Sequence, residues 1–421
     1  MSGVEGGVAQ QLAERQAVRR QKSLVRRRTA IRLTAATLAV AALGAGALTP
    51  PPPTMGAGEA PMAQWAALRL PAPVPQAPAP LLAQIEALGA AFEGRAGIAV
   101  RDIEGGWTAA HDGDGLYPQQ SVSKLWVAIS VLDAVDRGVL RLTDPVTVRL
   151  EDLSIFHQPI RDHVGRNGYP TTVGELLASA ATRSDNAAND ILMRLVGGPD
   201  HVRSVMAERA LGAISLGDEE RYFQTQIAGL EWRPEFSFGR NFWQARAAMP
   251  QDTRRAALEA YLNAPSDGAS PTAVVRALDR LAAGELLSPA STAHLLDLLA
   301  QSRTGPQRLG GGLVEGWRLA HKTGTGQVLG PRATGYNDVG LLTAPDGRTY
   351  AVAVFIAETT RPVPERQALM QAVTRAVIAQ HHGLDPTQVQ AEDFNLLPLI
   401  ASRDSAQLNL RPDFPAPVAS P

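Results

Sequence analysis

The 421-residue chain contains no cysteine. This absence excludes disulfide bonds, thiolate metal ligands and a cysteine nucleophile, although it is compatible with an oxidising compartment. Histidine is also scarce, and the eight histidines include no HxH or HExxH spacing that would indicate a metal site. We therefore expect neither a metal nor another cofactor.

Charged side chains are missing from residues 33–58, whereas residues 1–33 carry eight Lys or Arg against two Glu. A basic segment followed by an apolar stretch is typical of an export leader. The apolar stretch from Leu33 to Leu48 is short for a membrane span. We expect residues 1–49 to be an export signal or an uncleaved membrane anchor, and the protein to be periplasmic or secreted.

The chain beyond residue 33 has no excess of positive charge. Residues 1–33 carry a net charge of +6 and the whole chain carries −1, so the remainder carries −7. A nucleic-acid-binding protein needs a basic surface for the phosphate backbone, so no nucleic-acid partner is expected. We expect a monomer that contacts a membrane only if the N-terminal segment is not cleaved.

Regular periodicity is confined to the middle of the chain. Residues 50–80 are rich in proline and predict an extended linker, and residues 385–421 predict a flexible tail. One folded domain is therefore expected at 81–384. Its apolar spacing predicts helices at 81–93, 122–135, 172–180, 187–196, 201–211, 271–283, 289–301 and 365–381, and strands at 97–101, 107–110, 317–323, 337–343 and 349–357. The segment 213–269 is irregular, with scattered aromatic residues, and predicts a packed surface subdomain.

Three short motifs carry chemistry: Ser121 with Lys124 in SxxK, Ser184-Asp185-Asn186, and Lys322-Thr323-Gly324. Residues three apart share a helix face, so the Lys124 amine can reach the Ser121 hydroxyl and remove its proton. Each motif alone arises easily by chance, but all three in this order do not. Together they indicate a serine hydrolase that forms an acyl-enzyme.

The set of motifs resembles that of the class A β-lactamases and their penicillin-binding relatives. The resemblance covers about residues 81–383 and extends to Gly197-Gly198-Pro199, to the segment 283–287 and to Gly316-Trp317. It implies an α/β (α+β) fold of the β-lactamase/transpeptidase type. In this fold an antiparallel sheet is flanked by helices, a second part is all-helical, and the active-site cleft lies between the two parts.

The resemblance also implies roles in acylation. Ser121 would be the nucleophile and Lys124 its partner base, while Ser184 would pass a proton to the β-lactam nitrogen. The backbone N–H groups of Ser121 and Thr325 would bind the carbonyl oxygen as it gains negative charge.

Substrate binding is implied for a second set of residues. Asn186 would bind the side-chain amide of the substrate, and Lys322, Thr323 and Gly324 would hold its carboxylate.

Hydrolysis of the acyl-enzyme requires a further element. Class A enzymes use a glutamate on an Ω-shaped loop, followed four residues later by an asparagine, to hold the attacking water. Here Glu220 lies at the expected separation after Ser184, and Gln224 supplies a similar carboxamide four residues on. Arg221 replaces the usual proline, and Glu219 is a neighbouring alternative to Glu220.

Two departures from the family pattern lie near the expected cleft. Residues 236–269 contain roughly 30 additional residues beside the cleft mouth, where they could narrow or reshape it. The segment 326–335 after the third motif reads as a long loop, and its Arg332 is a candidate second clamp on the substrate carboxylate.

The function expected from these residues is that of a serine β-lactamase acting on small-molecule β-lactams. The alternative is a D,D-peptidase or penicillin-binding protein that acts on peptidoglycan stem peptides and is only slowly deacylated. A domain that merely binds would not need two amines beside a serine. Glu220 decides between the first two, because a carboxylate that activates water speeds deacylation.

Overall fold

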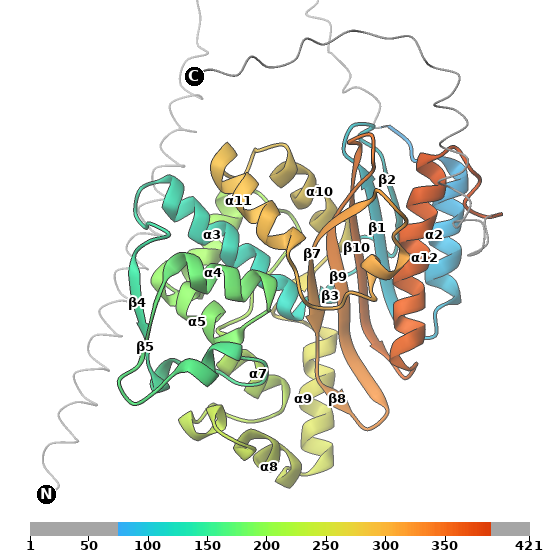
Figure 1. The fold of residues 1–421 in the computed structure, drawn as a ribbon. Coiled ribbons are helices and arrows are strands. Elements are labelled where there is room, and N and C mark those ends of the chain that lie inside the picture. The colour runs from blue at the N-terminus through green and yellow to red at the C-terminus, as the bar shows by residue number, and fades with distance from the viewer. Residues whose placement is uncertain (1–74, 389–421) are drawn as a thin grey trace, which may run out of the picture. The chain divides into compact units, whose positions relative to one another are not determined.

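An antiparallel sheet divides the structure, a computed structural model that describes residues 75–388 (Figure 1). Its strands follow the order β2-β1-β10-β9-β7, and β8 pairs with β9 outside this path. They are β1 (Arg95–Asp102), β2 (Thr108–His111), β7 (Arg318–Thr325), β8 (Val328–Leu329), β9 (Arg332–Thr343) and β10 (Thr349–Thr359). The export segment expected at 1–49, the linker up to residue 74 and the tail beyond residue 388 lie outside the described residues.

Both faces of the sheet are buried, so its central strand β10 is continuously apolar from Tyr350 to Ala357 rather than alternately polar. Successive side chains of β10 enter two separate cores. One core receives Tyr350, Val352, Val354 and Ile356, and the other receives Ala351, Ala353, Phe355 and Ala357. Helices α2 (Ala79–Ala91) and α12 (Val363–His381) cover the first face, and α10 (Pro271–Ala282) packs on the second (Figure 1).

The all-helical part packs beside β7, the strand at one edge of the sheet, through α11. Its central helix α3 is buried from Lys124 to Ala134, which explains its nearly continuous apolar sequence. The helices of this part are α3 (Lys124–Asp136), α4 (Val173–Thr182), α5 (Asn186–Leu195), α6 (Pro199–Glu208), α7 (Glu220–Ile227), α8 (Asn241–Ala248), α9 (Gln251–Asn263) and α11 (Pro289–Ala300).

Short elements complete the described chain. The two-stranded sheets pair β3 (Tyr117–Pro118) with β6 (Gly268–Ala269) and β4 (Pro145–Val148) with β5 (Tyr169–Thr172). The 3-10 turns are η1 (Gln120–Ser123), η2 (Leu150–Asp152), η3 (Pro159–His163), η4 (Pro234–Ser237) and η5 (Leu309–Gly312). The expected fold class, an antiparallel sheet with flanking helices and an all-helical part, is confirmed, and every predicted helix and strand overlaps an observed one.

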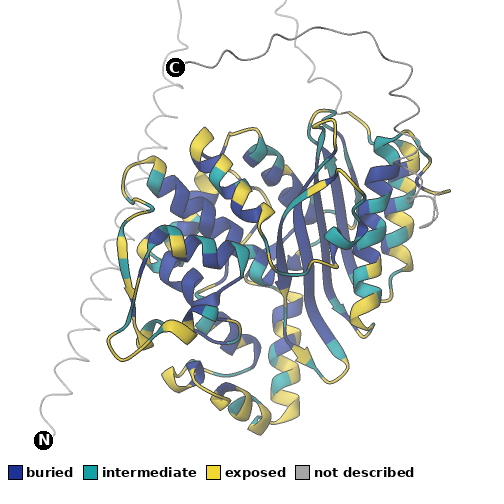
Figure 2. Ribbon diagram, viewed as in Figure 1, coloured by how far each residue is buried: buried dark blue, intermediate teal, exposed yellow. Residues whose placement is uncertain are grey.

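The segment 213–269 differs from the prediction, because it contains helices where no period was visible. Helix α8 buries only Phe242 and α9 buries only three side chains, so neither displays an apolar stripe in its sequence. Figure 2 shows both helices largely exposed. They pack through two small clusters of their own, Phe223, Ile227, Leu258, Tyr261 and Leu262 in one, and Ile155, Ala228, Phe236 and Phe242 in the other.

The segment 326–335 also differs from the predicted loop. Its residues form β8 and the beginning of β9, which pair as a hairpin from Val328 to Ala333.

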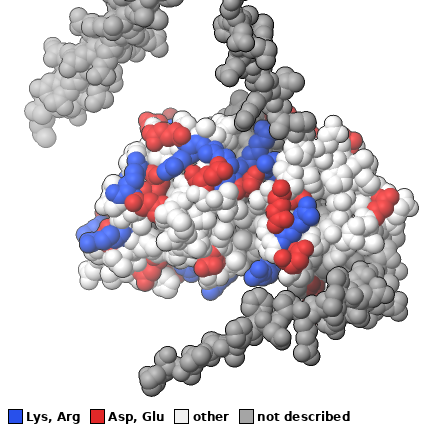
Figure 3. All heavy atoms as spheres, turned by 90° about the horizontal axis from the view of Figure 1, so that it is seen from above, with Lys and Arg blue, Asp and Glu red and all other residues white. Residues whose placement is uncertain are grey.

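The surface seen from above carries basic and acidic side chains side by side, with wide uncharged areas between them (Figure 3). Within residues 75–388, no helix combines the length and apolar character needed to cross a membrane.

Candidate active site

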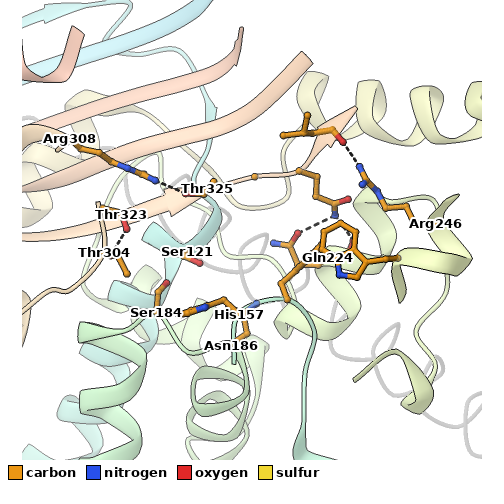
Figure 4. A pocket seen from close by; sticks show the side chains of 15 residues that line it. Ser121, His157, Ser184, Asn186, Gln224, Arg246, Thr304, Arg308, Thr323 and Thr325 are labelled. Atoms are coloured by element: carbon orange, nitrogen blue, oxygen red, sulfur yellow. Dashed lines mark hydrogen bonds between the residues drawn. The ribbon is translucent and has the colours of Figure 1, made fainter. Parts of the chain in front are cut away.

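A cavity of about 430 Å³ lies where β7, η1 and the loop before α5 meet. Ser121 and Ser184 both line it, with Arg308 on one side and Arg246 on the other (Figure 4). Of the residues singled out in the sequence, six line the cavity: Ser121, Ser184, Asn186, Gln224, Thr323 and Thr325. Lys124, Lys322 and Glu220 are buried beside them, so the three motifs and the glutamate converge.

The nucleophile candidate Ser121 lies in the turn η1, directly before α3. Its Oγ lies 2.8 Å from Lys124 Nζ, in agreement with the helical spacing of the two residues. The Lys124 side chain is buried, and its Nζ also contacts Glu220 Oε1. A single amine therefore bridges the serine hydroxyl and a carboxylate.

The close approach of β7 to this turn depends on Gly324. A Cβ at this position would lie 2.2 Å from the carbonyl oxygen of Gln119, a contact that real side chains cannot make. Gly324 thus acts by leaving space rather than by lining the cavity. Since β7 is an edge strand, part of its backbone faces away from β9, toward Ser121.

Ser184 lies in the turn between α4 and α5 with a left-handed backbone (φ 60°). Asp185 caps α5 by accepting a hydrogen bond from the Ala188 N–H (3.1 Å), and it also accepts one from the Ile160 N–H (2.7 Å). These bonds fix the strained turn, so that Ser184 Oγ can accept a hydrogen bond of 2.8 Å from Lys322 Nζ.

Lys322 is almost completely buried in β7. Burial lowers the pKa of its amine well below the ordinary value, and the nearby charge of Lys124 lowers it further. The chain contains only three lysines, and two of them are Lys124 and Lys322. Their concentration here was a sequence signal in its own right.

Glu220 is the first residue of α7, not part of an extended loop. Its Oε2 accepts a hydrogen bond from Gln224 Nε2 (3.1 Å), one helical turn later. The neighbouring Glu219 is directed elsewhere, because its carboxylate pairs with Arg194 and Arg221 at 2.5 and 2.7 Å. Of the two candidate glutamates, only Glu220 thus contacts Lys124.

A buried carboxyl group supports the start of α7. Asp190 on α5 accepts hydrogen bonds from the backbone N–H of Glu220 (2.7 Å) and the hydroxyl of Ser154 (2.8 Å). Burial, together with the charge of Glu220, raises the pKa of Asp190 to about 7.

Asn186, the residue expected to bind the side-chain amide of the substrate, lines the cavity at the start of α5. Its Nδ2 donates a hydrogen bond of 2.9 Å to the carbonyl of Ile155, and its backbone N–H donates one to the carbonyl of His157. Phe156 and His157 line the cavity as well.

Arg332 does not line the cavity, so the structure does not place it where it could clamp the substrate carboxylate, contrary to the prediction from the sequence. The guanidinium pairs with Glu358 on the neighbouring strand and with Glu259 (3.6 Å) on α9. These carboxylates satisfy the charge and hold the side chain away from Ser121.

Arg308 occupies the place that sequence reasoning gave to Arg332. It donates hydrogen bonds to Thr325 Oγ1 (2.6 Å) and to the carbonyl oxygens of Gly324 (2.8 Å) and Asn337 (2.6 Å), and it stacks 3.8 Å from the Tyr336 ring centroid. Its buried Nε has no hydrogen-bond partner among residues 75–388. Arg308 comes before η5 in no recognisable motif, so nothing in the sequence separated it from the other arginines.

Comparison with known proteins places this geometry in a family. The family model described as "Beta-lactamase enzyme family" matches residues 80–381. The chain is 27% identical over 280 residues to Beta-lactamase VEB-1 of Pseudomonas aeruginosa, covering 66% of this chain and 83% of that protein. It is 28% identical over 264 residues to the extended-spectrum beta-lactamase PER-1 of the same organism, covering 62% and 73%.

Solved structures agree with this family. An ancestral class A beta-lactamase is 31% identical with a TM-score of 0.56, covering 71% of this chain and 99% of its own. A beta-lactamase from Chitinophaga pinensis is 27% identical with a TM-score of 0.59, covering 72% and 99%. The chain therefore belongs to the beta-lactamase enzyme family, as a serine β-lactamase of class A.

Proposed function

We propose that this protein hydrolyses β-lactams through an acyl-enzyme on Ser121, with Glu220 and Gln224 activating the water that releases the product. The observation that carries the proposal is the continuous contact from Ser121 Oγ through Lys124 Nζ to the Glu220 carboxylate. Such a contact lets one buried amine serve both the attack by the serine and the later attack by water.

In acylation, Ser121 Oγ attacks the carbonyl carbon of the lactam and Lys124 takes the hydroxyl proton across 2.8 Å. The backbone N–H groups of Ser121 and Thr325 stabilise the oxygen that gains negative charge. The C–N bond of the ring then breaks. Ser184, held by Lys322, passes to the departing nitrogen the proton that Lys124 removed from Ser121.

The other cavity residues position the substrate. Thr323, Thr325 and Arg308 present hydroxyl and guanidinium groups at one end of the cavity, where they suit the carboxylate of the substrate. Asn186 and Gln224 present amides on the acyl side-chain side, where they can bind the amide of the substrate.

In deacylation, a water held between Glu220 and Gln224 attacks the ester, and Glu220 accepts its proton. The ester bond to Ser121 Oγ breaks, and the proton returns to that oxygen through Lys124. The burial of Glu220 and its contact with Gln224 support this role. A general base of this kind is worth about 10² to 10⁴ in rate.

The experiment mixes the purified protein with a chromogenic cephalosporin and follows both turnover and protein mass. We expect repeated turnover, its loss in Ser121→Ala, and a stable mass adduct in Glu220→Gln. Glu219→Gln is the matched control, because the same change one residue earlier leaves the Lys124 contact intact and should retain turnover.

A stoichiometric adduct without turnover in the unmutated protein would favour a D,D-peptidase that acts on peptidoglycan and is only trapped by β-lactams. An absence of both adduct and turnover would contradict the proposal.

We also propose that the protein acts after export, in the periplasm or outside the cell, and as a monomer. The basic segment and apolar stretch within residues 1–49 support export. The residues assigned to acylation and deacylation all belong to one chain, so a monomer is sufficient for the proposed reaction. Cell fractionation and the mass of the purified protein in solution test these two statements.

A further inference from the structure

The additional segment 236–269 supplies part of the cavity wall. Two consecutive turns of α8 place Trp243 and Arg246 against the cavity, on the side that also carries Gln224 (Figure 4). Trp243 meets Phe156 edge to face, with ring centroids 5.1 Å apart. An aromatic surface and a guanidinium thus lie together on one side of the cavity.

Arg246 makes no ion pair within residues 75–388. Its Nη2 donates one hydrogen bond of 2.5 Å to the carbonyl of Val328, and its guanidinium lies 5.9 Å from the Trp243 ring centroid. Burial lowers the pKa of Arg246 and the nearby charge of Arg254 adds to this, so a bound anion would offset an unfavourable environment.

The described residues that line the cavity include two guanidinium groups but no carboxylate. Arg308 lies beside Thr325 at the β7 end, which is the end suited to the carboxylate that every penicillin or cephalosporin carries. Arg246 lies at the opposite end, across Ser121 and Gln224 (Figure 4). A substrate with a single carboxylate leaves this second cation without a counter-ion.

We propose that Arg246 binds an anionic substituent on the acyl side chain of the substrate, while Trp243 and Phe156 pack against an aryl group on the same side chain. The preferred substrates are therefore aryl β-lactams with two negative charges. The inference rests on the proposed function, since it takes the acylation site at Ser121 as given.

Two penicillins test it directly. Carbenicillin is benzylpenicillin with a second carboxylate on the carbon that bears the phenyl ring, so the pair differs by one charge. In Arg246→Gln we expect the ratio of kcat/KM for carbenicillin to that for benzylpenicillin to fall about 10-fold, mainly through KM. Arg246→Lys should retain part of the preference, because the charge remains.

The control is Arg255→Gln, which removes a guanidinium from α9 that is exposed and pairs with Asp252. It should leave the ratio within about 2-fold, as expected for a surface ion pair. Trp243→Ala should lower kcat/KM for both aryl penicillins more than for 6-aminopenicillanic acid, which has no acyl side chain.

An equal loss for both penicillins in Arg246→Gln would mean that the residue only braces the carbonyl of Val328, and this would overturn the inference. If instead the unmutated protein formed no adduct with either penicillin or with a chromogenic cephalosporin, the proposed function itself would fail. Turnover of the cephalosporin with an unchanged penicillin ratio overturns the inference alone.

Discussion

Gln120 and Tyr261, far apart in the sequence, are joined by a hydrogen bond of 2.6 Å from Gln120 Nε2 to Tyr261 Oη. Tyr261 donates in turn to Asp267 Oδ1 (2.9 Å), and Asp267 Oδ2 accepts from the Gln120 backbone N–H (2.6 Å). The side-chain oxygen Oε1 of Gln120 accepts a hydrogen bond from Gln224 Nε2 (2.9 Å). Helix α9 is thereby connected to the residue before the nucleophile and to the partner of Glu220.

We predict that Tyr261→Phe slows deacylation more than acylation. Loss of the hydroxyl leaves Gln120 Nε2 and Asp267 Oδ1 without their hydrogen bonds to Tyr261 and frees Gln224 to move away from Glu220. Stopped-flow measurement should show a burst of acylation followed by a steady-state rate about 10-fold lower. Tyr222→Phe removes a hydroxyl from an exposed tyrosine and should change neither phase. Equal slowing of both phases in Tyr261→Phe would contradict this connection.

The pH dependence of stability should contain a contribution from Asp267. Burial raises its pKa to about 7. An unfolded aspartate ionises near pH 4, so from about pH 4 to 7 the folded protein holds the extra proton and this group's contribution to stability falls as the pH rises. Asp267→Asn removes this carboxyl group and should change the slope of the free energy of unfolding against pH by up to about 1.4 kcal/mol per pH unit in that window.

Urea unfolding at several pH values measures this slope. Asp114→Asn is the control, because Asp114 is exposed, and its curve should run parallel to that of the unmutated protein. Parallel curves for Asp267→Asn would show that the carboxyl group is ionised throughout, contrary to expectation.

Activity at alkaline pH should depend on Lys322. Its lowered pKa means that the positive charge is lost at a lower pH than for an ordinary lysine, and affinity for the substrate carboxylate should decline as the charge disappears. Arginine does not titrate in this range. In Lys322→Arg we therefore expect a lower kcat/KM at neutral pH but a weaker decline above it. A pH profile of unchanged shape would argue that another group controls the alkaline limb.

Shortening a buried side chain of α3, the helix that begins at Lys124, should destabilise the protein. Leu132 on α3 is fully buried, and Leu132→Ala should lower the free energy of unfolding by about 2–5 kcal/mol. Leu116, with 46% of its surface exposed, provides the matched change, and Leu116→Ala should cost less than about 1 kcal/mol. Chemical denaturation of the two variants compares them.

The parts of this molecule that are regular in sequence were predictable, and those that depend on tertiary contacts were not. Strand β10 and helix α3 can be predicted from the sequence, because an element that is buried on every side requires a run of apolar residues. The acylating residues were found because their chemistry fixes both residue type and spacing. Helices α8 and α9 were missed, since they bury too few side chains to create a period.

Choosing between candidates of equal chemistry also required coordinates. Glu219 and Glu220 are adjacent and identical in type. The ion pairs of Glu219 with Arg194 and Arg221, and the contact of Glu220 with Lys124, separate them. Arg332 is the predicted clamp because it lies in the segment after the third motif and its guanidinium matches a carboxylate, whereas Arg308 reaches Thr325 through space. Sequence distance is a poor guide where a strand edge brings distant segments together.

The small cluster beneath α8, formed by Ile155, Ala228, Phe236 and Phe242, is separate from the two large cores. Substitutions on the outer turns of α8 therefore need not disturb the packing that holds Ser121 and Lys124. We therefore expect such substitutions to change substrate preference more than they change acylation by Ser121 and Lys124. Exchanging α8 alone offers a route to new substrate ranges, for natural variation and for protein engineering alike.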